Sequence, residues 1–146
     1  MKYICPICQL KPSSHSLINV LETEELIYYY TCPAQAILYD DVHGIIKHYD
    51  GVLSEMPENK EWVWIFDSLG FSLIHAMQVN VAIELAKLIS NKFSKNLKKI
   101  IIINLTFYIT ITHKLIMPFL HNKVKDIIEI NYDSKCVEEI FYKMFN

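Results

Sequence analysis

Hydrophobic residues along this chain form two patterns, short continuous runs and long segments with helical spacing. One run, Trp62–Phe66, is followed by Asp67 and Gly70, and a second run, Lys99–Asn104, contains four consecutive isoleucines. Between the two runs, apolar residues recur at helical spacing over Leu73–Phe93. This order predicts a strand–helix–strand unit with parallel strands. Because the runs are apolar at neighbouring positions, we expect a sheet covered on both faces, as in an open α/β fold.

A second amphipathic helix is predicted between residues 42 and 56, where apolar residues share one face. Asp40 and Asp41 precede it and offer oxygens for its N-cap. Gly44 and Gly51 weaken this helix, and Gly44 allows another segment to pack closely against it. Three further elements follow the central unit. These are a helix over 106–120 that Pro118 stops or bends, a strand over 126–131 and a last helix capped by Ser134.

The first 32 residues predict a small unit ahead of the α/β domain. Residues 15–21 and 26–31 are rich in β-forming side chains and predict a hairpin. With its turn centred between Thr23 and Glu24, residues whose numbers sum to 47 face each other. An alternative interpretation makes residues 26–31 an edge strand of the main sheet. We expect two units, a Cys-x-x-Cys knuckle and β-hairpin appendage at 1–32 and an α/β domain at 33–146.

Four residues of this N-terminal unit have side chains that zinc prefers. Cys5 and Cys8 form a Cys-x-x-Cys pair, which is one half of a zinc site. In the predicted hairpin His15 faces Cys32, and their Cβ atoms would be about 4.5–5.5 Å apart. Three cysteines and one histidine are a permitted ligand set for structural zinc. The predicted ligands of one structural zinc ion are therefore Cys5, Cys8, His15 and Cys32.

Two other interpretations of these cysteines stay open. Free cysteines are common in protein interiors, and one Cys-x-x-Cys pair is a weak signal. A redox pair is the second alternative, but such motifs usually open a helix after a strand, whereas this motif precedes a predicted hairpin. The chain shows no signal peptide, so we expect a cytoplasmic protein, in which disulfides are rare.

The order of motifs from Trp62 onward resembles the CRAL-TRIO lipid-binding domain, the fold of phosphatidylinositol-transfer and retinaldehyde-binding proteins. In that family a strand ends in Asp before a Gly-aromatic turn, the next strand ends in Asn, and a Pro-Phe-Leu segment follows. The matching residues here are Asp67, Gly70, Phe71, Lys92, Phe93, Leu97, Lys99, Asn104, Pro118, Phe119 and Leu120. The resemblance extends from Leu26 to Phe145. Thr106 stands where the family usually has proline. We therefore expect a divergent, reduced member without the helical domain that often precedes the fold.

The resemblance implies a cavity for an apolar ligand between the sheet and the helix at 107–120. It also implies that this helix gates entry to the cavity. The residues expected to contact the ligand are Phe66, Phe71, Phe107, Ile111, Leu115 and Phe119.

Charge and composition limit the other partners. The formal net charge is −2 and all fourteen basic residues are lysines, which argues against nucleic-acid binding. Four lysines cluster before the four consecutive isoleucines of the second run. They predict either a solvated face or a transient contact with anionic lipid headgroups, worth about 1 kcal/mol per lysine at a membrane surface. They are Lys92, Lys95, Lys98 and Lys99.

The sequence gives little support for catalysis. It contains no Gly-rich phosphate loop and no G-x-S-x-G motif. Asp67 follows a strand, where enzymes of this class place catalytic groups, but capping of the turn at Ser68–Gly70 explains it better. We therefore expect a non-enzymatic binding module for a lipid or other small hydrophobic ligand. The alternative is a protein-interaction scaffold of the same fold whose pocket is filled by its own side chains.

Overall fold

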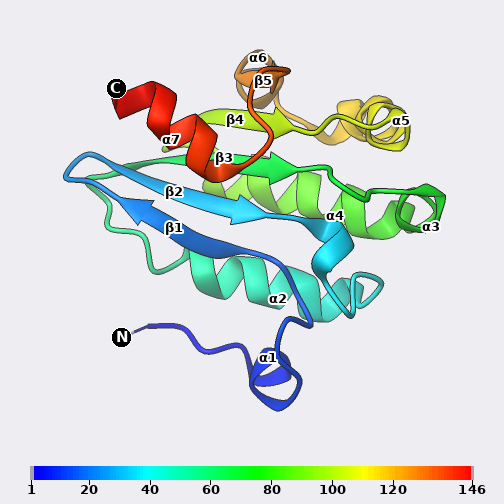
Figure 1. Ribbon diagram of the computed structural model, residues 1–146. Coiled ribbons are helices and arrows are strands. Elements are labelled where there is room, and N and C mark those ends of the chain that lie inside the picture. The colour runs from blue at the N-terminus through cyan, green and yellow to red at the C-terminus, as the bar shows by residue number, and fades with distance from the viewer. Residues whose placement is uncertain (1, 146) are drawn as a thin grey trace.

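Five strands form a single sheet in the computed structural model, which describes residues 2–145 (Figure 1). Met1 and Asn146, the outer ends of the two predicted units, lie outside the described residues. The strands are β1 (Ile18–Glu22), β2 (Leu26–Thr31), β3 (Glu61–Asp67), β4 (Leu97–Ile103) and β5 (Ile128–Asn131). They neighbour one another in chain order, with β1 antiparallel to β2 and the other pairs parallel. The predicted α/β fold with a mixed, mostly parallel sheet is confirmed.

Helices cover both faces of this sheet, but unequally. Helices α2 and α4 lie along one face and α7 lies across the other, whereas α1 lies on the outer side of α2, away from the sheet (Figure 1). The α-helices are α1 (Pro6–Leu10), α2 (Val42–Leu53), α3 (Leu73–Ala76), α4 (Val79–Leu88), α5 (Phe107–Ile116), α6 (Asn122–Asp126) and α7 (Val137–Phe145). Shorter turns are the 3₁₀ segments η1 (Pro33–Gln35) and η3 (Met117–Phe119) and the π-helical turn η2 (Ile89–Phe93).

Strand β3 shows why both faces need cover. Trp62 and Trp64 belong to the larger core cluster beneath the sheet, and Val63 and Ile65 belong to the smaller cluster under α7. The alternation follows from the two-residue period of a strand. The indole N–H of Trp62 donates to the Phe93 carbonyl at 2.9 Å, which joins η2 to the strand.

The hairpin forms, but the predicted register is wrong. Glu22 pairs with Ile27 and Ile18 pairs with Tyr30, with an irregularity between them. The reason lies in the turn, where the Thr23 N–H donates to the Leu26 carbonyl at 2.8 Å and the Leu26 N–H donates to the Thr23 hydroxyl at 3.0 Å. The centre of the turn therefore lies between Glu24 and Glu25, one residue later than predicted. His15 and Cys32 both lie outside the paired strands and do not face each other.

The hairpin is also part of the main sheet. Strand β2 pairs in parallel with β3 over its whole length, from Leu26 opposite Glu61 to Thr31 opposite Phe66. The alternative interpretation of residues 26–31 therefore describes the structure, except that β1 and not β2 is the edge strand. Residues 18–31 are an integral part of the α/β sheet and not an appendage to it.

The region predicted as one helix over residues 73–93 consists of three segments, which are α3, α4 and the π-helical turn η2. Helix α3 begins with a capping box in which Ser72 and His75 exchange hydrogen bonds. Gln78 then leaves the helical conformation, with ψ at 61°, and α4 starts at the next residue. This change of direction lets α3 pack against α5 while α4 lies along the sheet.

Candidate functional site

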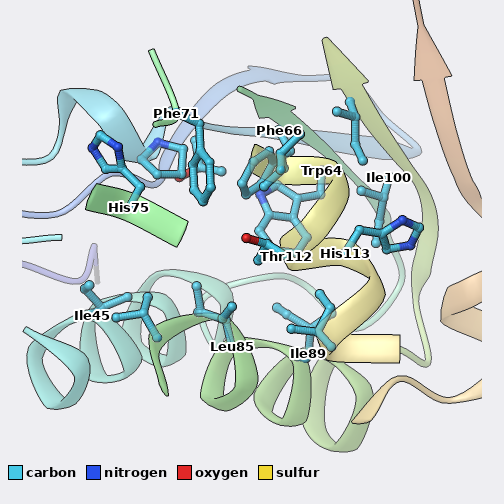
Figure 2. A pocket seen from close by; sticks show the side chains of 18 of the residues that line it. Ile45, Trp64, Phe66, Phe71, His75, Leu85, Ile89, Ile100, Thr112 and His113 are labelled. Carbon is cyan, nitrogen blue, oxygen red and sulfur yellow. The ribbon is translucent and has the colours of Figure 1, made fainter. Parts of the chain in front are cut away.

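An apolar cavity of about 150 Å³ lies between the sheet and the helices beneath it. Figure 2 shows Trp64, Phe66 and Ile100 from the strands on one side and Leu85 and Ile89 on the other. Helix α5 closes a third side. Further lining residues are Ile45, Tyr49, Ala82, Ala86, Ile102, Ile109 and Ile116. Nearly every wall is therefore hydrocarbon or aromatic ring.

The structure places only two of the six residues predicted to contact a ligand in the cavity wall. Phe66 and Phe71 line the cavity, and Phe119 packs against the neighbouring core beneath Lys87, whose Nζ is 5.3 Å from the ring centroid. The other three face away from the cavity and are exposed, Phe107 by 71%, Leu115 by 48% and Ile111 by 37%.

The inner side of α5 is the side that sequence reasoning missed. Four of its residues line the cavity, namely Ile109, Thr112, His113 and Ile116. The Thr106 hydroxyl accepts from the Ile109 N–H at 3.3 Å and fixes where the helix begins. Six of the ten residues of α5 are apolar or aromatic, and Ile109 and Ile111 are both among them, so periodicity alone does not choose between its faces.

Two polar atoms in the cavity wall lack a hydrogen-bond partner within residues 2–145. They are the indole Nε1 of Trp64 and the Nε2 of His113, and both are buried. Burial lowers the pKa of His113, so its imidazole is neutral near pH 7. A buried polar group without a partner costs about 1–3 kcal/mol. A ligand that hydrogen-bonds either atom would recover part of that cost.

A small aromatic cluster stands at one end of the cavity. The His75 ring lies 4.4 Å from the Tyr39 ring and 5.4 Å from the Phe71 ring, measured between centroids. The Ser72 N–H donates to His75 Nδ1 at 3.0 Å, so the second ring nitrogen, Nε2, carries the proton of the neutral form. Burial lowers the pKa of His75, which also favours that neutral form. This end is therefore uncharged as well.

Asp67 caps the turn after β3, as predicted. Its carboxylate accepts from the Leu69 N–H at 3.0 Å, the Tyr30 hydroxyl at 2.6 Å and the Asn104 amide at 3.0 Å. Asn104 holds a left-handed backbone with φ of 54°, and its amide also donates to the Lys135 carbonyl at 2.8 Å. The carboxylate thus joins β2, β3 and β4 at their carboxyl ends.

A second cluster lies outside the cavity and contains most of the predicted metal ligands. One donor atom from each of Cys5, Cys8, His15 and His48 lies within 4.8 Å of the others. Cys32 is not a member, because its sulfur approaches the Leu69 carbonyl at 3.6 Å near the carboxyl end of the sheet. Sequence reasoning missed His48, which α2 presents to the N-terminal segment.

The four clustered lysines, two of them before β4 and two near its start, lie at the opposite end of the sheet from Asp67. Lys92 pairs with Asp50 at 2.5 Å, and Lys99 pairs with Glu129 at 2.9 Å. These exposed pairs contribute little to stability but reduce the local positive charge. No helix in the described part of the chain has both the length and the hydropathy required to cross a bilayer.

Comparisons with known proteins agree with this architecture. A family model described as CRAL/TRIO domain matches residues 6–145. Among solved structures, the chain is similar to one described as "Crystal structure of Sfh5", with a TM-score of 0.63 and 12% sequence identity. The match covers 80% of this chain and 46% of that chain, so this chain accounts for less than half of the Sfh5 length. No curated protein matches the sequence.

Proposed function

Since the chain belongs to the CRAL/TRIO domain family, we propose that it is a non-enzymatic module that binds a lipid or another small hydrophobic ligand in the cavity beside the sheet. The observation that supports this proposal is the combination of apolar walls with two unpartnered polar atoms, on Trp64 and His113. Ligand sites commonly have this composition, with apolar walls and a few polar groups that fix orientation.

The walls favour an uncharged ligand segment. The lining of the cavity, as described within residues 2–145, includes no lysine, aspartate or glutamate. An acyl chain, a ring system or a neutral hydroxyl or carbonyl group fits this environment, whereas a phosphate would lie in it without a counter-charge. If the ligand is a phospholipid, we expect its headgroup to lie outside the cavity.

The size of the cavity requires movement for a large ligand. Drug-sized ligands occupy pockets of about 300–1,000 Å³, whereas a dry cavity near 150 Å³ holds a molecule the size of benzene. At about 150 Å³, this cavity is therefore too small to hold a whole lipid without movement of its walls. We propose that α5 is the element that moves, because it forms one wall and has an exposed outer face.

The direct test is to extract the purified protein with organic solvent and to analyse the extract by mass spectrometry. We expect one class of lipid or apolar molecule in about equimolar amount, as for a single internal site. Protein purified from several hosts without such a molecule, and unable to take up a fluorescent fatty acid, would argue against the proposal.

Exchanging isoleucine for threonine on the two faces of α5 tests which face contacts the ligand. Ile109→Thr removes apolar surface from the cavity wall, and we expect affinity for a fluorescent fatty acid to fall about tenfold, since each lost CH₂ contact is worth about 0.8 kcal/mol. Ile111→Thr is the matched control on the exposed face, and its affinity should change less than about twofold. The reverse result would restore the sequence-based assignment of Ile111.

The second candidate function is a protein-interaction scaffold of the same fold. The small cavity favours it, because large side chains such as Trp64 and Phe66 already occupy much of the space. A stable protein partner together with a ligand-free cavity would support the scaffold.

We also propose that the protein makes a transient contact with a membrane surface when it takes up its ligand. The outer sides of α3 and α5, which pack together, expose Leu73, Ile74, Met77, Phe107 and Leu115. We place the contact there and not at the four clustered lysines. Apolar groups beside the moving helix would insert into the membrane from which the ligand is taken up. A cytoplasmic location accords with the four free cysteines.

A further inference from the structure

The Cys and His cluster has the geometry of a metal site, independently of the cavity. The Nδ1 atom of His15 is 3.5 Å from the Cys5 sulfur and 3.7 Å from the Cys8 sulfur, and the Nδ1 of His48 is 3.7 Å from the Cys8 sulfur. A tetrahedral zinc ion with Zn–S near 2.3 Å and Zn–N near 2.0–2.1 Å separates its sulfur and nitrogen ligands by about 3.5 Å. The observed spacings are those of a zinc shell.

The hydrogen bonds of the two imidazoles select the nitrogen that faces the cluster. The Nε2 of His48 lies 3.1 Å from the Leu17 carbonyl, and a carbonyl only accepts, so Nε2 carries the hydrogen. The Nε2 of His15 lies 3.1 Å from a carboxylate oxygen of Asp41, which gives the same tautomer. In the neutral form of each ring this tautomer leaves Nδ1 with a lone pair that is directed toward the sulfurs. Metal-bound histidines usually donate their second N–H to a carboxylate or a carbonyl in this way.

The surroundings also suit a divalent ion. Cys5, His15 and His48 are buried, and Cys8 is partly exposed, which leaves a path for the ion. Two thiolates balance the charge of one zinc ion, so the assembled site is neutral in a buried place. Gly44 makes room for the supporting carboxylate, because a Cβ at that position would come within 1.9 Å of an Asp41 oxygen and 2.9 Å of His15 Nε2.

We propose that Cys5, Cys8, His15 and His48 form a structural zinc site that fixes the N-terminal segment to the outer side of α2. Zinc replaces the proton of each thiol, and both protons pass to solvent. The site also joins the wall of the ligand cavity, since Ser16 and Tyr49 follow the two histidines and both line that cavity. The Tyr49 hydroxyl donates to the Ser16 carbonyl at 3.1 Å, which connects the two ligand-bearing segments directly.

A redox role fits less well. The Cys-x-x-Cys pair does open a helix, contrary to the expectation from the sequence, but α1 has five residues and no strand precedes it within the described residues. A disulfide needs only the two sulfurs, so it gives no reason for two histidines whose lone pairs are directed at the thiols. They complete a metal shell.

Metal analysis of the full chain, purified without a tag or chelator in a reducing buffer, tests the proposal. We expect about one zinc per chain, as for a structural site. Cys8→Ser and His48→Gln should each lower zinc content at least about tenfold, since each variant removes one of the four bonds to the metal. The matched controls are Cys32→Ser and His43→Gln, which change a cysteine and an exposed α2 histidine outside the cluster and should leave zinc unchanged. Zinc that depends on Cys32 and not on His48 would overturn the proposal.

A measurement on the unaltered chain covers the case in which the variants do not fold. Alkylation of Cys8, followed by mass spectrometry, should be slow with zinc bound and become several-fold faster after a chelator, whereas Cys136 should react alike in both conditions. Cobalt in place of zinc should give the visible absorption of a tetrahedral thiolate complex. Reduced protein that binds neither metal, or a Cys5–Cys8 disulfide that excludes both, would refute the site.

Discussion

Replacing Asp67 with alanine is expected to lower the free energy of unfolding by about 3–4 kcal/mol and the melting temperature by roughly 10 °C. The carboxylate is buried and accepts from Tyr30, Leu69 and Asn104. Its loss takes the acceptor from the Tyr30 hydroxyl and the Leu69 N–H, and it leaves the Asn104 amide with the Lys135 carbonyl alone. A buried donor without a partner costs about 1–3 kcal/mol. Chemical denaturation followed by circular dichroism measures the change.

Two further variants separate the hydrogen bonds from mere loss of volume. Asp67→Asn keeps an oxygen for Leu69 and Asn104, so we expect it to cost about 1–2 kcal/mol. In a Tyr30→Phe background one donor is already absent, and Asp67→Ala should cost about 1 kcal/mol less than in the unaltered chain. A cost below about 1 kcal/mol for Asp67→Ala itself would contradict the structural role of this carboxylate.

Replacing Ala86 with phenylalanine is expected to abolish ligand binding while leaving the protein folded. Ala86 is a buried residue of α4 that lines the cavity. A phenyl ring matches a cavity of this size, because about 150 Å³ is the space that holds benzene in a protein interior. Filling the space costs less than overpacking a dense core, so we expect stability to change by less than about 1 kcal/mol.

Uptake of a fluorescent fatty acid, together with analysis of copurified molecules, measures the effect of Ala86→Phe. We expect affinity to fall at least about a hundredfold, since the ring removes the volume in which a ligand would lie. Glu84→Phe is the matched control, because it adds the same ring to an exposed position of α4. Equal binding by Ala86→Phe and the unaltered chain would place the ligand elsewhere and contradict the proposed function.

The sheet could be predicted from the sequence because strands buried on both faces leave a plain signal. The runs at Trp62 and Ile100 are apolar at successive positions, and each residue meets one of two cores. The hairpin register could not be predicted as easily, since the position of its turn depends on local hydrogen bonds between Thr23 and Leu26. A one-residue change in that turn moved His15 and Cys32 out of register.

The ligand set and the metal set were only partly predictable for two different reasons. Helix α5 carries apolar residues on its cavity face and on its outer face, so the choice between Ile109 and Ile111 depends on tertiary packing that the pattern does not contain. For the cysteine cluster, the hairpin pattern predicted Cys32 as the fourth ligand, whereas the structure has His48 of α2 in that position. A usable signal existed, because Gly44, His48 and Gly51 follow at spacings of four and three and therefore share one stripe of the helix.

Gly51 of α2 lies against the N-terminal segment, so a substitution there can measure whether that segment is docked. A Cβ at Gly51 would come within 2.4 Å of the Tyr3 ring, so alanine there cannot coexist with the docked segment as it stands. In a helix free of that segment, alanine would instead be favoured over glycine by about 1 kcal/mol. The sign of the stability change in Gly51→Ala therefore reports the state of the segment. Gly51→Ala should lower the free energy of unfolding when the segment is docked and raise it once chelation or another change releases the segment. One methyl group thus serves as a thermodynamic reporter of attachment.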